Sequence, residues 1–344
     1  MRPPMYMAQA ATLPQSSDVV EKAIRALTTD DDDLLTSPLV TAASLLLIGS
    51  FFWFPAGLYW FYRKKCTTRT RKIAFVVALV ILLGAPLPVD RRLTKLWIWE
   101  RFLRYFKARV VPPNDSGKLT QALFAVIPHG IFPFGIAMTA LTSFNAEHFL
   151  KARPVVASAI TFTPLVGHIL RAIGAVPASP PAVTAALRSG LSLCLAPGGI
   201  AEIFWGWPRP GCDRNKEYAL LRDRKGFVRR AVEAGVPLVP VYVFGISDTF
   251  KRVPLPGLFE TLSRFLKASI VLFYGSWGLP VPFRIPVHLA MGVPILPDPG
   301  RVPGSPAGPA EVDSVHARFC EAVVALFERH KAEYGWGDRQ LEIV

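Results

Sequence analysis

The sequence has few cysteines, and they are not arranged to bind a metal or to form a disulfide framework. The 344 residues include only four: Cys66, Cys194, Cys212 and Cys320. They lie far apart, and no Cys-x-x-Cys pair occurs. The six histidines do not cluster either. We therefore expect no metal site.

Several familiar catalytic motifs are also missing. There is no Gly-x-Ser-x-Gly elbow, since Ser276 lies in "GSWG", which has the wrong spacing. Neither a Gly-x-Gly-x-x-Gly fingerprint nor a P-loop occurs. These absences disfavour a serine hydrolase and a nucleotide-dependent enzyme.

Acidic residues are scarce in a chain that is unusually apolar. Lysine and arginine number 39 against 25 acids, a formal charge of +14, while 51% of the residues are hydrophobic. This composition predicts a membrane-associated protein whose charge meets anionic headgroups or a phosphorylated substrate. No nucleic-acid-binding module accompanies the charge, so we expect no nucleic-acid partner.

The amino-terminal quarter divides into a polar tail and an apolar region. Residues 1–36 carry the acidic run Asp30 to Asp33 and are expected to be a disordered tail. A cleaved signal peptide is not expected, because the first apolar stretch follows acidic residues. Residues 37–89 are expected to form a membrane hairpin from two apolar segments, 38–62 and 73–89. The first is long enough to cross a bilayer, whereas the second is short and interrupted by prolines.

Basic residues flank the second apolar segment on both sides. Six lie in the linker from Arg63 to Lys72, and more follow Val89. The positive-inside rule cannot place both flanks in the cytosol if residues 73–89 cross the membrane. We therefore predict that one or both segments are re-entrant or monotopic, with Pro55 bending the first.

From residue 90 to residue 344 the pattern alternates between strands and helices, which predicts a single domain. Four near-continuous apolar runs indicate buried strands: 122–127, 155–160, 191–196 and 238–244. Helices are predicted over 163–173, 181–188 and 226–234, the last ending at Gly235. Asp313 is expected to cap a final amphipathic helix. This alternation is typical of an α/β fold with a mostly parallel sheet and helices on both faces.

His129 is the leading candidate for a catalytic base. It directly follows the strand ending at Ile127, and ligands bind beyond the carboxyl ends of parallel strands. Pro128 stiffens the turn, and Gly130 lets the backbone approach a ligand closely. The alternative is a core histidine bonded to a nearby carbonyl.

A second candidate stretch is "LAPGGIAEIFWGW". Glu202 stands among apolar residues, where a carboxylate needs a partner, and His129 is the natural one. The N–H groups of Gly198 and Gly199, and those near Gly130, are candidates to hold a developing oxyanion. A glycine turn with an exposed glutamate is the competing interpretation.

Five basic residues surround the start of the 226–234 helix: Arg222, Arg224, Lys225, Arg229 and Arg230. Cations beside free helix N–H groups form a phosphate site, for which Arg224, Lys225 and Arg229 are the chosen candidates. A solvated helix face near anionic headgroups is the alternative.

Taken together, these stretches resemble the type 2 diacylglycerol acyltransferase family, which includes monoacylglycerol and wax-alcohol acyltransferases. "IPHGIFPFG" resembles its His-Pro-His-Gly block, and "PGGIAE" its Gly-Gly-x-x-Glu block. "RKGFVRRAVEAGVPLVPVYVFG", "WGLPVPFRIPVHLAMGVPI" and "LFERHKAEYGWGDRQLEIV" are similar to later family stretches, in the same order. The likeness covers roughly residues 95–344.

The resemblance implies a glycerolipid-acyltransferase-like fold and transfer of a fatty acyl group from acyl-CoA to diacylglycerol, giving triacylglycerol. Acyl-CoA would be a substrate, so no cofactor is expected. It maps the catalytic histidine onto His129 and the glutamate onto Glu202. It also implies the endoplasmic reticulum membrane or lipid droplets, with the catalytic domain in the cytosol. A homo-oligomer is possible but does not follow from the sequence.

Two positions depart from the family pattern. Ile127 replaces the first histidine of its block, and Ile246 stands where a glutamate usually follows Phe244-Gly245. Phe134 occupies the place of the aspartate found in phospholipid-making relatives, which disfavours lysophosphatidate as the acceptor. Monoacylglycerol and long-chain alcohols stay open as acceptors. A non-catalytic lipid-binding protein is an alternative of another class, against which the retained His129 and Glu202 argue.

Overall fold

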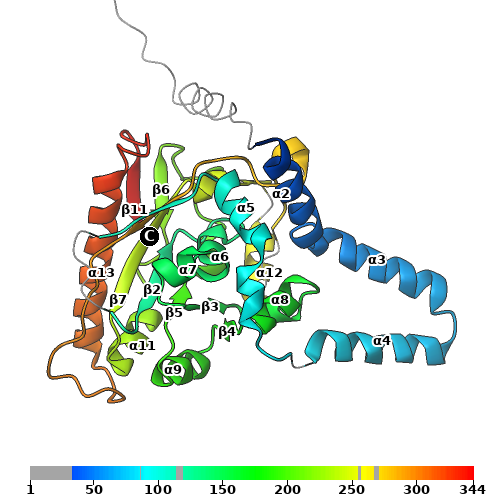
Figure 1. Ribbon diagram of the computed structural model, residues 1–344, viewed down its shortest axis with the longest axis horizontal. Helices are drawn as coiled ribbons and strands as arrows, with labels where there is room; N and C mark the ends of the chain where they lie inside the picture. Colours follow the sequence, from blue (N-terminus) through cyan, green and yellow to red (C-terminus); the bar gives the residue numbers. More distant parts are fainter. Residues whose placement is uncertain (1–32, 86, 114–118, 255–256, 267–270) are drawn as a thin grey trace, which may run out of the picture.

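The computed structural model describes residues 33–344, apart from 86, 114–118, 255–256 and 267–270 (Figure 1). Residues 1–32 of the predicted tail therefore lie outside the described residues. The last four tail residues belong instead to helix α2 (Asp33–Leu47).

A seven-stranded sheet forms the centre of the molecule, as the alternating pattern predicts. Its order is β1 (Arg109–Val111), β10 (His288–Met291), β7 (Leu238–Phe244), β2 (Leu123–Ile127), β5 (Leu193–Leu195), β3 (Arg153–Val156) and β4 (Val176–Pro177). The strands from β7 to β4 are parallel, whereas β10 is antiparallel to β7 and β1 is parallel to β10. The sheet is therefore mostly parallel, and the α/β prediction is confirmed.

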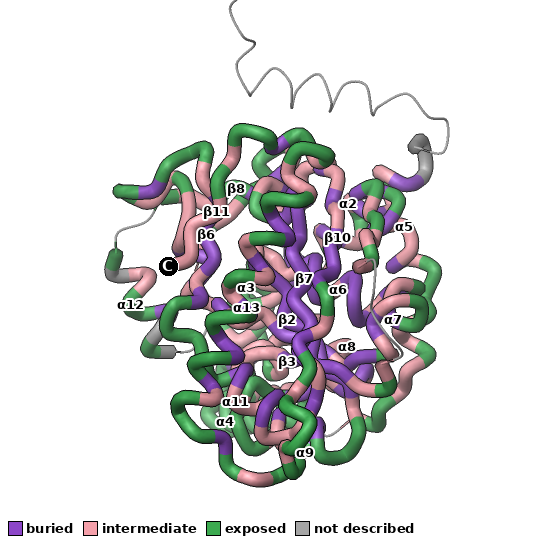
Figure 2. Tube along the Cα trace, turned by 90° about the vertical axis from the view of Figure 1, so that its left-hand side faces the viewer, coloured by how far each residue is buried: buried purple, intermediate pink, exposed green. Residues whose placement is uncertain are grey.

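Helices cover both faces of this sheet, each over its own apolar cluster. One face carries α9 (Pro180–Arg188), α11 (Gly226–Ala234) and α13 (Pro309–His330); the other carries α2, α5 (Trp97–Tyr105), α6 (Phe134–Leu141) and α7 (Phe144–Glu147). The central strands β2 and β7 are buried along their whole length (Figure 2). Burial on both faces explains their near-continuous apolar sequences.

Shorter elements connect and flank these layers. They are α8 (Val166–Ala172), α10 (Gly199–Glu202), α12 (Gly257–Leu266), the 3₁₀ helices η1 (Arg91–Lys95), η2 (Ser158–Phe162), η3 (Ile246–Asp248) and η4 (Ser276–Gly278), a parallel pair β6 (Lys216–Ala219) and β11 (Gln340–Ile343), and an antiparallel pair β8 (Lys251–Arg252) and β9 (Phe273–Tyr274). The β6–β11 pair brings the last residues of the chain beside the segment that follows β6.

Most predicted elements are present, but two predictions are wrong. The strand expected over 155–160 ends at Val156, because the following residues form η2. The final helix begins at Pro309, so Asp313 lies inside it and pairs with Lys225 rather than capping the helix. Gly235 does end α11 in the left-handed conformation, as predicted.

The first predicted apolar segment is divided between α2, which packs on the body, and α3 (Ser50–Lys65); the second is largely α4 (Arg69–Gly84). Helices α3 and α4 project side by side from the body (Figure 1). Their contact includes the stacked rings of Phe61 and Phe75, 5.7 Å apart. Most of their apolar side chains are exposed; they include Phe52, Trp53, Trp60, Val76, Val80 and Ile81. We call this pair the α3–α4 hairpin.

The break in the first apolar segment lies at Ile48–Gly49, so the bend predicted at Pro55 is wrong. A Cβ at Gly49 would lie 2.1 Å from the Leu45 carbonyl oxygen, so only glycine fits at the break. Within the described ranges no single helix is long and apolar enough to cross a membrane. The stretch Thr36–Leu47 and α3, bent by 47°, meet the length and composition of a crossing only as a pair.

Candidate active site

The turn after β2 holds His129 through its own backbone. The His129 Nδ1 lies 2.7 Å from the Gly130 carbonyl oxygen. A carbonyl can only accept a hydrogen bond, so Nδ1 carries the proton and Nε2 keeps its lone pair in the neutral ring. Gly130 has a φ of 69°, and a Cβ there would lie 2.9 Å from Ile246 Cγ1. The turn therefore requires glycine at this position.

Glu202, on α10, lies beside this turn and is only 5% exposed. Its Oε2 accepts the backbone N–H of His129 at 2.7 Å, and its Oε1 accepts the backbone N–H of Leu220 at 3.0 Å. The two predicted residues are thus brought together, but the carboxylate binds the main chain of His129 instead of its ring. A Cβ on Gly198 would lie 2.5 Å from Glu202 Cδ, so Gly198 makes room for the carboxylate.

The surroundings shift the pKa values of both groups. Burial raises the pKa of Glu202 to about 7, while the two N–H donors and the charge of Arg224 oppose that rise. Desolvation lowers the pKa of His129, and the bond to Gly130 partly offsets the effect. The imidazole is therefore neutral near pH 7, as a general base must be.

A cavity of 1280 Å³ opens beside His129. Its wall is mostly apolar and comes from both sides of the α2–α3 break, from α6 and from α8. Leu47, Ile48, Phe51 and Phe52 form one part of this wall, and Arg224 and Arg230 belong to another. The cavity therefore has an apolar lining with His129 and two arginines among its polar groups.

Of the predicted phosphate-binding residues, only Arg224 lines this cavity. Its guanidinium makes no hydrogen bond or ion pair with another residue that the structure describes. Lys225 instead pairs with Asp313 at 2.8 Å, and Arg229 donates to the Ala307 carbonyl at 3.0 Å. Arg230 also lines the cavity, while bonding to Glu233 at 2.9 Å.

The glycine amides differ in what they bind. The Gly199 N–H donates to the Ala196 carbonyl at 3.2 Å. Within the described residues the Gly198 N–H donates to no acceptor, and Gly198 lines the cavity. The Gly130 N–H likewise has no acceptor among them, although Gly130 does not line the cavity. Gly198 is therefore the better placed donor.

The segment Leu220–Lys225, which connects Glu202 to Arg224, is held by contacts from α13 and from the residue that follows β11. The Leu221 carbonyl accepts the Arg224 N–H at 2.8 Å and His316 Nε2 at 3.0 Å. The Val344 carbonyl accepts the N–H groups of Leu221 and Arg222 at 2.9 and 3.0 Å. Sequence reasoning missed His316, although its place between Val315 and Phe319 on an apolar stripe signals a buried histidine.

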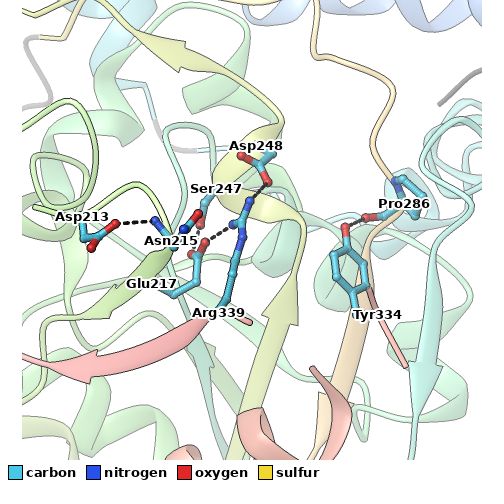
Figure 3. A network of polar contacts seen from close by, with 8 residues as sticks. All are labelled: Asp213, Asn215, Glu217, Ser247, Asp248, Pro286, Tyr334 and Arg339. Carbon is cyan, nitrogen blue, oxygen red and sulfur yellow. Dashed lines mark hydrogen bonds and ion pairs between the residues drawn. The ribbon is translucent and has the colours of Figure 1, made fainter. Parts of the chain in front are cut away.

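A partly buried ionic network joins Glu217, Asp248 and Arg339 (Figure 3). Arg339 binds Glu217, which is 7% exposed, and also Asp248 at 3.3 Å. The Ser247 hydroxyl donates to Glu217 at 2.8 Å. Burial raises the pKa of Glu217 to about 7, and the Arg339 charge opposes the rise. The network ties β6 to the end of β7 and to the start of β11, and no local sequence pattern indicates it.

The two departures from the family pattern lie in packed positions. Ile127 is fully buried on β2 and pairs in register with Tyr242 on β7. Ile246 is buried against Gly130. No group of three or more His, Cys, Asp or Glu residues is arranged to hold a metal ion within the described ranges.

Comparison with known proteins shows the family of this chain. The sequence profile of the family described as "Diacylglycerol acyltransferase" matches residues 76–344, which include His129, Glu202 and the arginines of the cavity. The chain belongs to the diacylglycerol acyltransferase family. It is an acyltransferase, and the resemblance noted from its motifs is confirmed.

Three relatives show how similar this chain is in sequence to other acyltransferases. Diacylglycerol O-acyltransferase 2-like protein 6 of Bos taurus is 32% identical over 266 residues, covering 71% of this chain and 76% of that protein. Diacylglycerol O-acyltransferase 2 of Homo sapiens is 29% identical, covering 69% and 64%. The 2-acylglycerol O-acyltransferase 1 of Bos taurus is 28% identical, covering 69% and 73%.

Among solved structures, the 1-acyl-sn-glycerophosphate acyltransferase PlsC of Thermotoga maritima overlaps with a TM-score of 0.42 at 12% identity. The overlap covers 87% of this chain and 96% of that one.

Proposed function

We propose that this acyltransferase moves a fatty acyl chain from acyl-CoA to the free hydroxyl of diacylglycerol, giving triacylglycerol. The observation that carries the proposal is the His129 ring, which lines a mostly apolar cavity while its Nδ1 is tied to Gly130. The unprotonated Nε2 is then available to a hydroxyl that enters the cavity with a lipid.

In the proposed reaction, Nε2 of His129 takes the proton of the acceptor hydroxyl as its oxygen attacks the thioester carbonyl. The resulting tetrahedral intermediate carries its negative charge on the former carbonyl oxygen. When it collapses, the carbon–sulfur bond breaks, and the CoA sulfur leaves with the proton from the imidazolium. No covalent acyl-enzyme forms. General-base catalysis of this kind contributes roughly 10²- to 10⁴-fold in rate.

The other residues of the site position His129 and stabilise the oxyanion. Glu202 holds the His129 main chain, which makes it a positioning residue. The Gly198 N–H is proposed as the oxyanion donor, with Gly130 as a second candidate, because neither N–H has an acceptor among the described residues. Gly199 is left out of this role since its N–H is already bonded to Ala196.

The CoA phosphates are assigned to the arginines of the cavity. Arg224 is exposed and has no ion-pair partner within the described part of the chain, and Arg230 lines the same cavity. Guanidinium groups bind phosphate through paired N–H donors. Lys225 and Arg229 would instead support this site from the side of α13, through Asp313 and Ala307.

The size of the cavity suits two lipid substrates. Pockets of about 300–1,000 Å³ enclose most of a drug-sized ligand. The cavity beside His129 measures 1280 Å³ and is therefore large enough for a long acyl chain together with part of an acceptor.

The α3–α4 hairpin is proposed to lie in the membrane interface. Each helix has 16 residues and spans about 24 Å, less than the roughly 30 Å hydrocarbon core of a bilayer. Basic residues lie at its tip, from Arg63 to Lys72, and at its base, at Arg91 and Arg92. A hairpin lying flat keeps both basic ends at headgroup level, which removes the conflict with the positive-inside rule.

We propose the endoplasmic reticulum membrane or the lipid droplet as the location, with the catalytic domain in the cytosol. A protease-accessible tag inserted at Thr67–Thr68 tests it in sealed microsomes. Cleavage from the cytosolic side is expected. Protection of the tag, with the carboxyl-terminal domain still cleaved, would contradict an interfacial hairpin.

Monoacylglycerol is the second candidate acceptor, favoured by the similarity to 2-acylglycerol O-acyltransferase 1. Long-chain alcohols are a further member of the same class. Detergent-solubilised protein, labelled oleoyl-CoA and each acceptor in parallel would distinguish them, with lysophosphatidate as a control acceptor. We expect triacylglycerol from the wild type and at least a 10²-fold loss in His129→Ala. Folded wild-type protein that gives no product with any acceptor would instead indicate a non-catalytic lipid-binding protein.

A further inference from the structure

Two arginines lie close together at the base of the α3–α4 hairpin, and neither pairs with a carboxylate among the described residues. Arg91 lies on η1, and Arg153 begins β3. Arg91 Nη2 donates only to neutral oxygens, Asn145 Oδ1 at 3.2 Å and the Lys151 carbonyl at 3.3 Å. The nearby carboxylate of Asp90 is bound by Arg92 at 2.8 Å.

Arg153 is the more unusual of the two. Its guanidinium makes no hydrogen bond or ion pair with any residue that the structure describes, and its Nε is buried without an acceptor. Partial burial of Arg91, and then the charge of Arg153, lower the pKa of Arg91. Like charges held together in a partly desolvated place cost free energy, and a bound anion removes that cost.

The pair lies where the hairpin meets the domain. Arg153 Nη1 and Val89 Cγ1 both lie 3.2 Å from the point where a Cβ on Gly174 would stand, so the guanidinium neighbours an exposed apolar side chain. Arg171 donates to the Leu83 carbonyl at the end of α4, at 2.5 Å, which fixes the hairpin to α8. A boundary between exposed apolar helices and basic side chains is where lipid headgroups lie.

We propose that Arg91 and Arg153 form a binding site for the phosphate of an anionic membrane lipid. Two guanidinium groups can each present paired N–H donors to phosphate oxygens, which a lone lysine cannot do. The site is separate from the cavity beside His129, whose lining includes neither arginine. The proposal of this lipid site rests on the interfacial placement of the α3–α4 hairpin and does not depend on acyl transfer.

The test measures binding by the purified full chain in non-ionic detergent, through the shift in unfolding temperature. The probes are dihexanoyl phosphatidate, dihexanoyl phosphatidylcholine and inorganic phosphate, so that the arms separate a lipid phosphate, a zwitterionic lipid and a free anion. We expect phosphatidate to stabilise the wild type. Arg153→Gln should weaken its binding at least roughly tenfold, since a charge-assisted contact is lost. The exposed Arg318→Gln on α13 is the matched control and should bind as the wild type does.

A second expectation distinguishes a binding site from a packing role. Without any anion, Arg153→Gln should unfold at or above the wild-type temperature, because a like-charge repulsion is removed. Arg91→Lys, which keeps the charge and loses the planar fork, should also bind phosphatidate more weakly.

Equal phosphatidate affinity in all variants would overturn the proposal, and so would a loss of stability in Arg153→Gln without anion. A response to inorganic phosphate as strong as that to phosphatidate would overturn the lipid source. None of these readouts needs acyl transfer, so a failure of the proposed enzyme activity would be seen separately.

Discussion

The Glu202 carboxylate binds His129 through the peptide N–H, with Oε2 2.7 Å from the backbone nitrogen. Its other oxygen binds the N–H of Leu220. One buried side chain thus joins the turn that holds His129 to the segment that carries Arg224. This arrangement and the contacts around it lead to five predictions.

Glu202→Gln should lower both stability and activity. An amide offers one acceptor oxygen and turns N–H donors toward the second backbone amide, so one buried donor loses its partner. Such a loss costs about 1–3 kcal/mol. Thermal unfolding and kcat with oleoyl-CoA measure the two effects. The exposed Glu321→Gln is the control, and a Glu202→Gln variant with wild-type stability would contradict the geometry.

The pH profile should show an acid limb that begins near pH 7. The two-amide contact needs the carboxylate, and Glu202 becomes protonated as the pH falls through about 7. His129, whose pKa is lowered below its usual value of 6.5, becomes protonated at still lower pH. We therefore expect kcat/KM to fall in two steps, of which Glu202→Gln removes the upper one.

Stability should respond to pH in the opposite sense to activity. Because the folded-state pKa of Glu202 lies above the ordinary value of 4.5, the folded chain binds this proton more tightly than the unfolded chain. Its contribution is fully present below pH 4.5 and is lost as the pH rises toward about 7. Unfolding curves of the wild type and Glu202→Gln across this range isolate it. In the activity profile, a two-step fall of kcat/KM that persists in Glu202→Gln would assign the upper step to another group.

His316→Leu should raise the KM for acyl-CoA severalfold and leave kcat nearly unchanged. The variant removes one of the two donors to the Leu221 carbonyl, which loosens the turn that carries Arg224 but not the base. His316→Gln supplies an N–H again and should restore much of the affinity. If both variants lose kcat and acceptor affinity equally, His316 serves packing alone.

Arg339→Met should destabilise the fold by up to about 3 kcal/mol, because the Glu217 carboxylate stays buried without its partner. The double variant Glu217→Gln with Arg339→Met removes both charges and should cost less. Chemical denaturation of the two variants makes the comparison. Equal losses would show that the charges of this network are not coupled.

Sequence patterns correctly predicted the elements whose bounds are set by a terminating residue or by the length of an apolar run. α11 and β7 occur with the predicted bounds, since Gly235 ends the helix and an unbroken apolar run forms the strand. The strand predicted over 155–160 was wrong beyond Val156, because a short apolar stretch does not distinguish a buried strand from a 3₁₀ turn. The start of α13 was missed although Pro309 at its first turn is a recognised signal.

For the site, the sequence predicted which residues meet but not how they meet. His129 and Glu202 do come together, yet the choice between ring and backbone depends on the turn of the main chain, which no local pattern encodes. Lys225 and Arg229 could not be separated from Arg224 without knowing that α13 packs on α11. The Arg91–Arg153 pair joins residues far apart in the chain and is visible only in the fold.

The bond between Glu202 and the His129 main chain has a consequence for how this turn can change in evolution. Every residue except proline carries a peptide N–H, so the contact does not depend on which side chains flank the histidine. The side chains at positions 127 and 246 can therefore differ while the contact that holds His129 stays in place. Variation should thus collect in the side chains that surround the turn, and acceptor preference can diversify without the catalytic geometry being rebuilt.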